Sequence, residues 1–208
     1  MIKKIIVDIL MFICMIMEFP RWYMPPIYHE IIWIILLILV ILHLWFNREY
    51  FKNLTKWKYN LSRWIMVIVN ISFFISFFLT IIFWVLSSQN LLTFANIHSL
   101  KLVELHKIFG YISLILMAFH LWINISWWMM KLEKKINNQI VFYTVKLILV
   151  WYWIYAFIKL NIWDHLIWRY GFSVLDWNIA INILNYLAVV IMITLIVNEI
   201  YMLVIKRK

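Results

Sequence analysis

The chain has 208 residues, of which 67% are hydrophobic and only 13% are charged, and its mean hydropathy is +0.93. A soluble domain is about half apolar and about a quarter charged, so this composition excludes an aqueous globular protein and indicates that lipid covers much of the surface. The net charge of +10 does not indicate nucleic-acid binding, because the basic residues form short clusters between long apolar runs.

Six apolar stretches approach the length of about 20 residues that a membrane-spanning helix needs. The first carries Asp8 and Glu18 and follows two lysines, so it resembles a signal sequence, but no small-residue cleavage site follows it and we expect an uncleaved anchor. We therefore expect an all-α, polytopic membrane protein with a single domain, residues 1–208. The six predicted spans lie at about 4–19, 28–47, 63–87, 105–130, 140–160 and 178–204.

The basic residues predict how these spans are oriented in the cytoplasmic membrane. Most of the 19 Lys and Arg residues lie before the first span, between the second and third, between the fourth and fifth, and after the last. By the positive-inside rule these places are cytoplasmic, and both termini are expected there. Lys146 lies inside the fifth span and can extend to the cytoplasmic surface. Residues 161–177, rich in Trp, are expected to form an interfacial segment on the outer side.

Four of the six histidines repeat one spacing on two predicted spans. His29 and His43 lie 14 residues apart on the second span, and His106 and His120 lie 14 apart on the fourth. Fourteen residues are close to four helical turns, so each pair faces nearly one way, with its members about 21 Å apart along the axis. One span separates the two helices, which therefore run parallel. The sequence predicts two level imidazole pairs, His29 with His106 near the outer surface and His43 with His120 near the cytoplasmic one.

Two facing imidazoles can hold a haem iron from both sides, and the cores of helix bundles are where such sites are built. The chain has no C-x-x-C-H sequence, so the group expected is a b-type haem, without covalent attachment. Burying an unpaired polar group in hydrocarbon costs on the order of a few kcal/mol, so four histidines within predicted spans indicate a functional role. Zinc is disfavoured because its ligands converge within about 2 Å of one ion. A proton relay through these histidines is the alternative to haem binding.

Other polar residues carry weaker expectations. Glu30 either hydrogen-bonds near a ligand histidine or a haem propionate, or is a solvated acid at a helix end, and Arg21 is a candidate propionate partner. His98 and His165 are expected as interfacial polar residues, with contact between His98 and a substrate or haem edge as the alternative. Four asparagines are expected to form hydrogen bonds between helices: Asn70, Asn124, Asn182 and Asn185.

Two sequence blocks resemble a known family. The first runs from Tyr28-His29-Glu30 to His43-Leu44-Trp45-Phe46-Asn47-Arg48, and the second is LHKIFGYISLILMAFHLWIN at 105–124; YAFIK at 155–159 and FSVLDW at 172–177 add to them. Over nearly the whole chain they resemble the bacterial flavinylation-associated cytochrome family. The resemblance implies a four-helix, cytochrome b-like bundle with two haem b groups and extracytoplasmic electron transfer beside a protein carrying covalent flavin. The implied axial ligands are His29, His43, His106 and His120.

The chain departs from that family at two kinds of position. Asn124 stands where similar proteins often carry a further histidine. The chain also has 14 Trp and only two Gly, and a Trp one turn from His29 would obstruct a porphyrin where glycine would let it approach the backbone. We hypothesise that some tryptophans are encoded by UGA codons that the organism reads as glycine. The tryptophans at positions where the family favours glycine are Trp33, Trp84, Trp122 and Trp153.

These observations predict a transmembrane electron carrier, an electron-transfer subunit of a membrane oxidoreductase. Electrons would come from quinol or another cytoplasmic-side donor and pass to an extracytoplasmic flavoprotein or small acceptor. With only Gly110 and Gly171, the chain offers no glycine-rich phosphate loop. One alternative is a haem-free transporter or proton pathway, which usually shows helices broken by Gly or Pro. Another is a membrane anchor that docks a partner protein.

Overall fold

The computed structural model describes residues 2–20, 24–54, 60–135, 139–167 and 178–205, and every regular element in these ranges is helical. The expected all-α class is therefore confirmed. In chain order the elements are α1 (Ile2–Met17), α2 (Pro26–Phe46), α3 (Arg48–Asn53), α4 (Leu61–Ser87), the 3-10 turn η2 (Thr93–Ala95), α5 (Leu100–Lys135), α6 (Gln139–Lys159), α7 (Ile162–Leu166) and α8 (Ile179–Ile205).

Four of these helices are long and apolar enough to cross a membrane: α2, α4, residues 100–125 of α5, and residues 179–201 of α8. They agree with four of the predicted spans to within a few residues. Large apolar side chains point outward from them, including Ile38 and Ile68, which are 54% and 57% exposed. An apolar surface of this kind is stable in lipid and unfavourable in water.

The spans predicted at 4–19 and 140–160 correspond to α1 and α6, and their crossing of the bilayer stays a prediction. Helix α1 has 16 residues, so it is about 24 Å long, shorter than the roughly 30 Å hydrocarbon core. Lys146 of α6 donates a hydrogen bond to Glu199 of α8 over 2.7 Å, which gives this cation a partner within the bundle.

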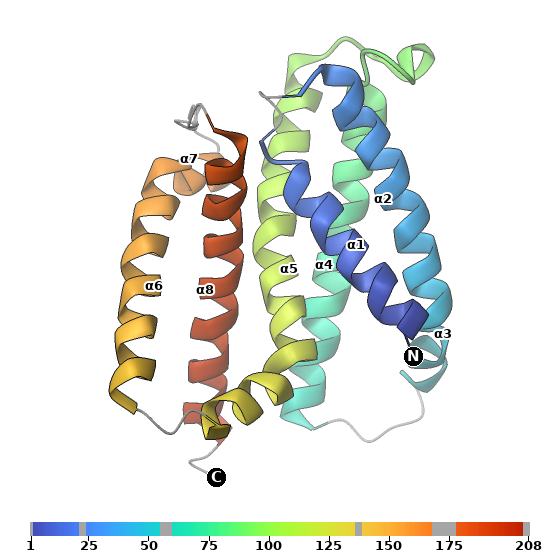
Figure 1. The fold of residues 1–208 in the computed structure, drawn as a ribbon. Coiled ribbons are helices and arrows are strands. Elements are labelled where there is room, and N and C mark those ends of the chain that lie inside the picture. Colours follow the sequence, from blue (N-terminus) through green and yellow to red (C-terminus); the bar gives the residue numbers. More distant parts are fainter. Residues whose placement is uncertain (1, 21–23, 55–59, 136–138, 168–177, 206–208) are drawn as a thin grey trace.

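Two antiparallel helical hairpins, α1–α2 and α4–α5, lie side by side, and α6, α7 and α8 pack on the far side of α5 (Figure 1). Backbones approach closely within each hairpin, between α5 and α8, and between α6 and α8. Where α4 meets α5, the hydroxyls of Ser76 and Ser113 lie 2.9 Å apart, and such small residues let helices approach. In contrast, imidazole and indole rings lie between α2 and α5.

The helix ends follow from local sequence. Helix α2 starts at Pro26, a position where proline sacrifices no intrahelical hydrogen bond. The side chain of Asn60 caps α4 by accepting a hydrogen bond from the backbone N–H of Arg63. Of the interfacial segment expected at 161–177, the structure describes Asn161 and the short helix α7. Residues 168–177 and Arg21 lie outside the described residues.

Candidate functional site

The structure brings the four repeated histidines together in the two pairs that their spacing predicts. The ring centroids of His29 and His106 lie 5.9 Å apart, and those of His43 and His120 lie 6.3 Å apart. One ring of each pair comes from α2 and the other from α5, and the two helices run in the same direction (Figure 1). We call His29 and His106 the outer pair, and His43 and His120 the inner pair.

Both separations match the spacing of two axial ligands on one metal. Two imidazoles that bind one iron from opposite sides, each through a nitrogen about 2 Å from the metal, have centroids about 6 Å apart. The observed 5.9 and 6.3 Å therefore fit bis-imidazole ligation at both levels.

Helix α1 and the turn directly after it supply one carboxylate to each histidine of α2. The Nδ1 atom of His29 lies 2.5 Å from Oε2 of Glu18, and Nδ1 of His43 lies 2.7 Å from Oδ1 of Asp8. Glu18 is buried, whereas the Asp8 side chain is 41% exposed. The two charges that made the first span look weak are thus the partners of the α2 imidazoles.

Helix α4 supplies a neutral acceptor to each histidine of α5. The Nδ1 atom of His106 lies 3.0 Å from the backbone carbonyl oxygen of Thr80, and Nδ1 of His120 lies 2.9 Å from Oδ1 of Asn70. Asn70 also donates from Nδ2 to the hydroxyl of Tyr50, 3.0 Å away on α3. Asn70 therefore bonds between helices, as expected from the sequence, and one of its partners is a candidate ligand.

All four rings thus have an acceptor oxygen close to Nδ1, an arrangement that favours the tautomer with the proton on Nδ1 and the lone pair on Nε2. Donors at Nε2 agree with this tautomer: the Trp33 indole N–H donates to Nε2 of His29 at 3.3 Å, and the amide of Asn124 lies 3.3 Å from Nε2 of His120. Metal-binding histidines commonly show this arrangement, in which a hydrogen bond at one nitrogen orients the ring and leaves the other for the metal.

The two hairpins are built alike. In each, two partner residues ten positions apart, on the first helix or in the turn directly after it, lie beside two histidines 14 positions apart on the second helix, in the antiparallel order that a hairpin requires. The inner histidines each begin a His-Leu-Trp-x-Asn segment, at 43–47 and 120–124. Asn47 and Asn124 donate to the carbonyl oxygen of their histidine, both at 2.8 Å. This repeated segment is the sequence signal that would have revealed the internal symmetry.

Asn124 donates a hydrogen bond to the backbone carbonyl oxygen of His120 within α5, and Asn182 donates one to that of Asn178, the residue before α8. The expectation of bonds between helices holds for Asn185, which accepts a hydrogen bond from the Tyr152 hydroxyl of α6 at 2.8 Å.

The inner pair has a phenyl ring as its aromatic neighbour and is partly exposed. Phe73 of α4 flanks it, with its ring centroid 5.5 Å from that of His120. The described residues around these two rings include no indole between them, and the His43 side chain is 22% exposed. These residues fit an iron porphyrin held between α2 and α5.

The outer pair differs, because indole rings occupy its surroundings. Trp33 is buried, with its centroid 6.4 Å from His29 and 5.7 Å from His106, and it stacks on Trp84 at 6.0 Å. Its N–H donates to the His29 nitrogen that an iron would need. The obstruction expected from the sequence at Trp33 is therefore present, and a porphyrin fits here only if the indole is absent or displaced.

Two of the four tryptophans for which the sequence suggests glycine have a buried N–H group without an acceptor among the described residues. The buried indole N–H groups of Trp84 and Trp153 find no hydrogen-bond acceptor among the residues that the structure describes. Each such group costs about 1–3 kcal/mol. Trp122 is better accommodated, since it donates to Asn198 at 3.3 Å.

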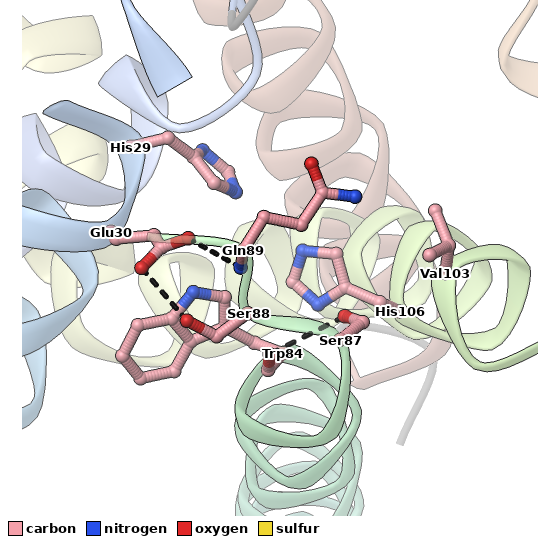
Figure 2. Close-up of a pocket in the computed structure, with 8 residues that line it drawn as sticks. All are labelled: His29, Glu30, Trp84, Ser87, Ser88, Gln89, Val103 and His106. Atoms are coloured by element: carbon pink, nitrogen blue, oxygen red, sulfur yellow. Dashed lines mark hydrogen bonds between the residues drawn. The ribbon is translucent and has the colours of Figure 1, made fainter. Parts of the chain in front are cut away.

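Glu30 is not the solvated acid at a helix end that was one of the two roles expected for it. Its carboxylate accepts hydrogen bonds from the side chains of Ser88 and Asn90 and from the backbone N–H groups of residues 89–91, at 2.6–3.0 Å. It is buried and holds the turn after α4 against α2. The turn, with Gln89, borders a small cavity into which the rings of His29 and His106 point (Figure 2).

The two remaining histidines lie away from both pairs. His98 is exposed, in the connection between α4 and α5, with a backbone φ of 53°. His165 on α7 stacks on Tyr111 with the centroids 4.2 Å apart. Burial, with the nearby charge of Lys107, lowers the pKa of His165. Neither residue adds a ligand to the imidazole pairs.

Comparison with known proteins gives no further guide, since no family profile, curated protein or solved structure matches the chain. Within the described ranges, no group of three or more His, Cys, Asp or Glu side chains is placed to hold a metal ion. The two imidazole pairs and the residues that orient them are therefore the features of the chain that indicate a function.

Proposed function

We propose that the chain is a b-type membrane cytochrome that carries electrons across the cytoplasmic membrane on two haems, one for each histidine pair. One observation carries the proposal: two pairs of imidazoles at ligand spacing, each ring with its Nδ1 on an acceptor. A bound haem would supply reversible one-electron chemistry, with a potential set by its axial ligands and surroundings.

The protein would hold and orient the group at each level. His43 and His120 would ligate at the inner pair, and His29 and His106 at the outer pair. Asp8, Glu18, Asn70 and the Thr80 carbonyl orient the rings. Ligation at the outer pair would in addition require the Trp33 indole to be displaced or absent. Four helical turns separate the levels, about 21 Å along the axis, so the two sites lie toward opposite membrane surfaces.

The charge distribution supports an assignment of the two sides. With the basic clusters in the cytoplasm, the outer pair faces the extracytoplasmic space, where a flavin-carrying protein or small acceptor would take electrons. The inner pair then lies closest to a cytoplasmic donor or to quinol. This orientation makes the protein the membrane-embedded electron-transfer subunit of an oxidoreductase.

The test is a reduced-minus-oxidised spectrum of the purified protein, with haem extraction and quantitation per chain. We expect a b-type spectrum and up to two haems per chain. One haem that depends on His43 would support the inner site and limit the proposal to it. A folded, membrane-inserted protein that binds no haem when expressed with excess haem would refute the proposal.

A proton pathway is the second candidate, because carboxylate–imidazole contacts occur at two depths, between Glu18 and His29 and between Asp8 and His43. Such pairs can relay protons in membrane proteins. Haem-free protein in liposomes would then conduct protons, and Asp8→Asn would abolish the conductance. A cytochrome predicts no conductance without haem. A pure anchor would tolerate alanine at all four histidines.

A further inference from the structure

The two hairpins place different chemistry at equivalent positions. On the α2 side the Nδ1 partners are carboxylates, Asp8 and Glu18, whereas on the α5 side they are the neutral oxygens of Asn70 and Thr80. Each histidine pair therefore combines one ring with an anionic partner and one with a neutral partner. The neutral partners meet their rings at 2.9 and 3.0 Å, so a neutral acceptor is enough to orient an imidazole in this fold.

The negative charge is therefore not needed to orient the rings, and burying a carboxylate is energetically unfavourable. Glu18 is buried, with its side chain 6% exposed, and a carboxylate out of water loses several kcal/mol of solvation unless it is well paired. A carboxylate that accepts the Nδ1 proton makes the imidazole a stronger donor at Nε2. A negative charge close to a metal also favours the state with the higher positive charge.

We propose that Asp8 is a positioning residue that lowers the reduction potential of the haem at the inner pair, acting through the imidazole of His43. Glu18 would act in the same way through His29 only if the Trp33 indole did not occupy the outer pair. The inference rests on the proposed function. Helix α1 is then part of the redox site as well as a membrane anchor. Asp8 and Asn70 lie beside the two rings of the inner pair. Removing the charge at Asp8 and adding one at Asn70 should therefore shift the reduction potential in opposite directions.

The test compares midpoint potentials of the inner-site haem in Asp8→Asn and Asn70→Asp with that of the unchanged protein. Asp8→Asn keeps an acceptor oxygen but removes the charge, and Asn70→Asp adds a charge at the equivalent place. We expect about a tenfold increase in the equilibrium constant for one-electron reduction in Asp8→Asn, about 59 mV more positive. We expect a shift in the opposite direction in Asn70→Asp.

Glu49→Gln is the matched control, since it removes an exposed carboxylate of α3 that is paired with Lys52. It should leave the potential unchanged. A potential that stays the same in Asp8→Asn and Asn70→Asp while haem remains bound would overturn the inference and leave the proposed function intact. Equal shifts in Asp8→Asn and Glu49→Gln would also overturn it, because they would show a general charge effect.

Loss of haem from Asp8→Asn is also informative. In that case Asp8→Glu, which restores the carboxylate, must restore the haem and a potential close to that of the unchanged protein. Failure of Asp8→Glu in both respects would overturn the inference. Absence of haem from the unchanged protein would instead refute the proposed function itself, so the two failures are distinguishable.

Discussion

The indole N–H of Trp33 donates a hydrogen bond to Nε2 of His29, with 3.3 Å between the two nitrogens. This contact occupies the lone pair through which His29 would bind a metal. The two histidine pairs differ in this respect. The stacked rings of Trp33 and Trp84 lie against the outer pair, whereas Phe73 is the aromatic neighbour of His120 in the inner pair.

Trp33→Gly should open the outer pair. We expect the haem content to rise by about one per chain relative to the protein with Trp33, because the Nε2 atoms of His29 and His106 become accessible together. Without haem, the same change should cost about 3–5 kcal/mol of stability, as expected for loss of a large buried ring. The measurement is haem quantitation on purified protein.

The matched control is Trp122→Gly, which removes another buried indole whose N–H donates to Asn198. It should leave the haem content unchanged. An equal gain of haem in both variants, or no gain in Trp33→Gly, would contradict the obstruction that we assign to Trp33.

The codons of these tryptophans make a separate prediction. The chain has 14 Trp and two Gly, and the buried N–H groups of Trp84 and Trp153 find no acceptor among the described residues. If UGA is read as glycine, positions 33, 84 and 153 are encoded by UGA, and peptides of the native protein carry glycine there by mass spectrometry. UGG codons at these positions, with tryptophan in the peptides, would refute the hypothesis.

Replacing Glu30 should lower the stability of the fold and have little effect on haem binding at the inner pair. Glu30→Ala removes the acceptor for the backbone N–H groups of residues 89–91 and for two side chains. Hydrogen bonds to a charged group contribute about 1.5–3 kcal/mol each and are not additive, so we expect a loss of about 3 kcal/mol. Thermal unfolding in detergent measures it, with the exposed Glu49→Ala as control. Equal stability of the two variants would contradict the role given to Glu30.

The orientation can be tested with cysteine labelling from either side of sealed vesicles. In a Cys14→Ser background, Lys52→Cys on α3 and Lys101→Cys at the start of α5 lie at opposite ends of the bundle and are exposed. We expect a membrane-impermeant maleimide to reach Lys101→Cys from the extracytoplasmic side and Lys52→Cys only from the cytoplasmic side. The reverse pattern would invert the direction of electron transfer that we propose.

The sequence alone predicts a large part of this arrangement, for a physical reason. A 14-residue spacing places two side chains on one helix face, so the matched spacings of His29–His43 and His106–His120 lead directly to two pairs. Long apolar runs likewise predict the ends of α2 and α4 to within two residues. Both inferences need only local helical geometry.

The partners of the imidazoles required tertiary information. Asp8 and His43 are 35 residues apart, and only the packing of α1 along α2 brings them together. From the sequence, Asp8 and Glu18 looked like charges that weaken a membrane span. The sequence likewise did not decide between two roles for Glu30. The N–H groups that donate hydrogen bonds to its carboxylate belong to a turn about 60 residues away in the chain.

Haem quantitation in single alanine variants of the inner pair tests the haem-binding role of the histidines. The account predicts that His43→Ala and His120→Ala each remove the same haem, since the two rings face each other at 6.3 Å, while His98→Ala removes none. A reduced-minus-oxidised spectrum of unchanged amplitude in His43→Ala or His120→Ala would contradict it.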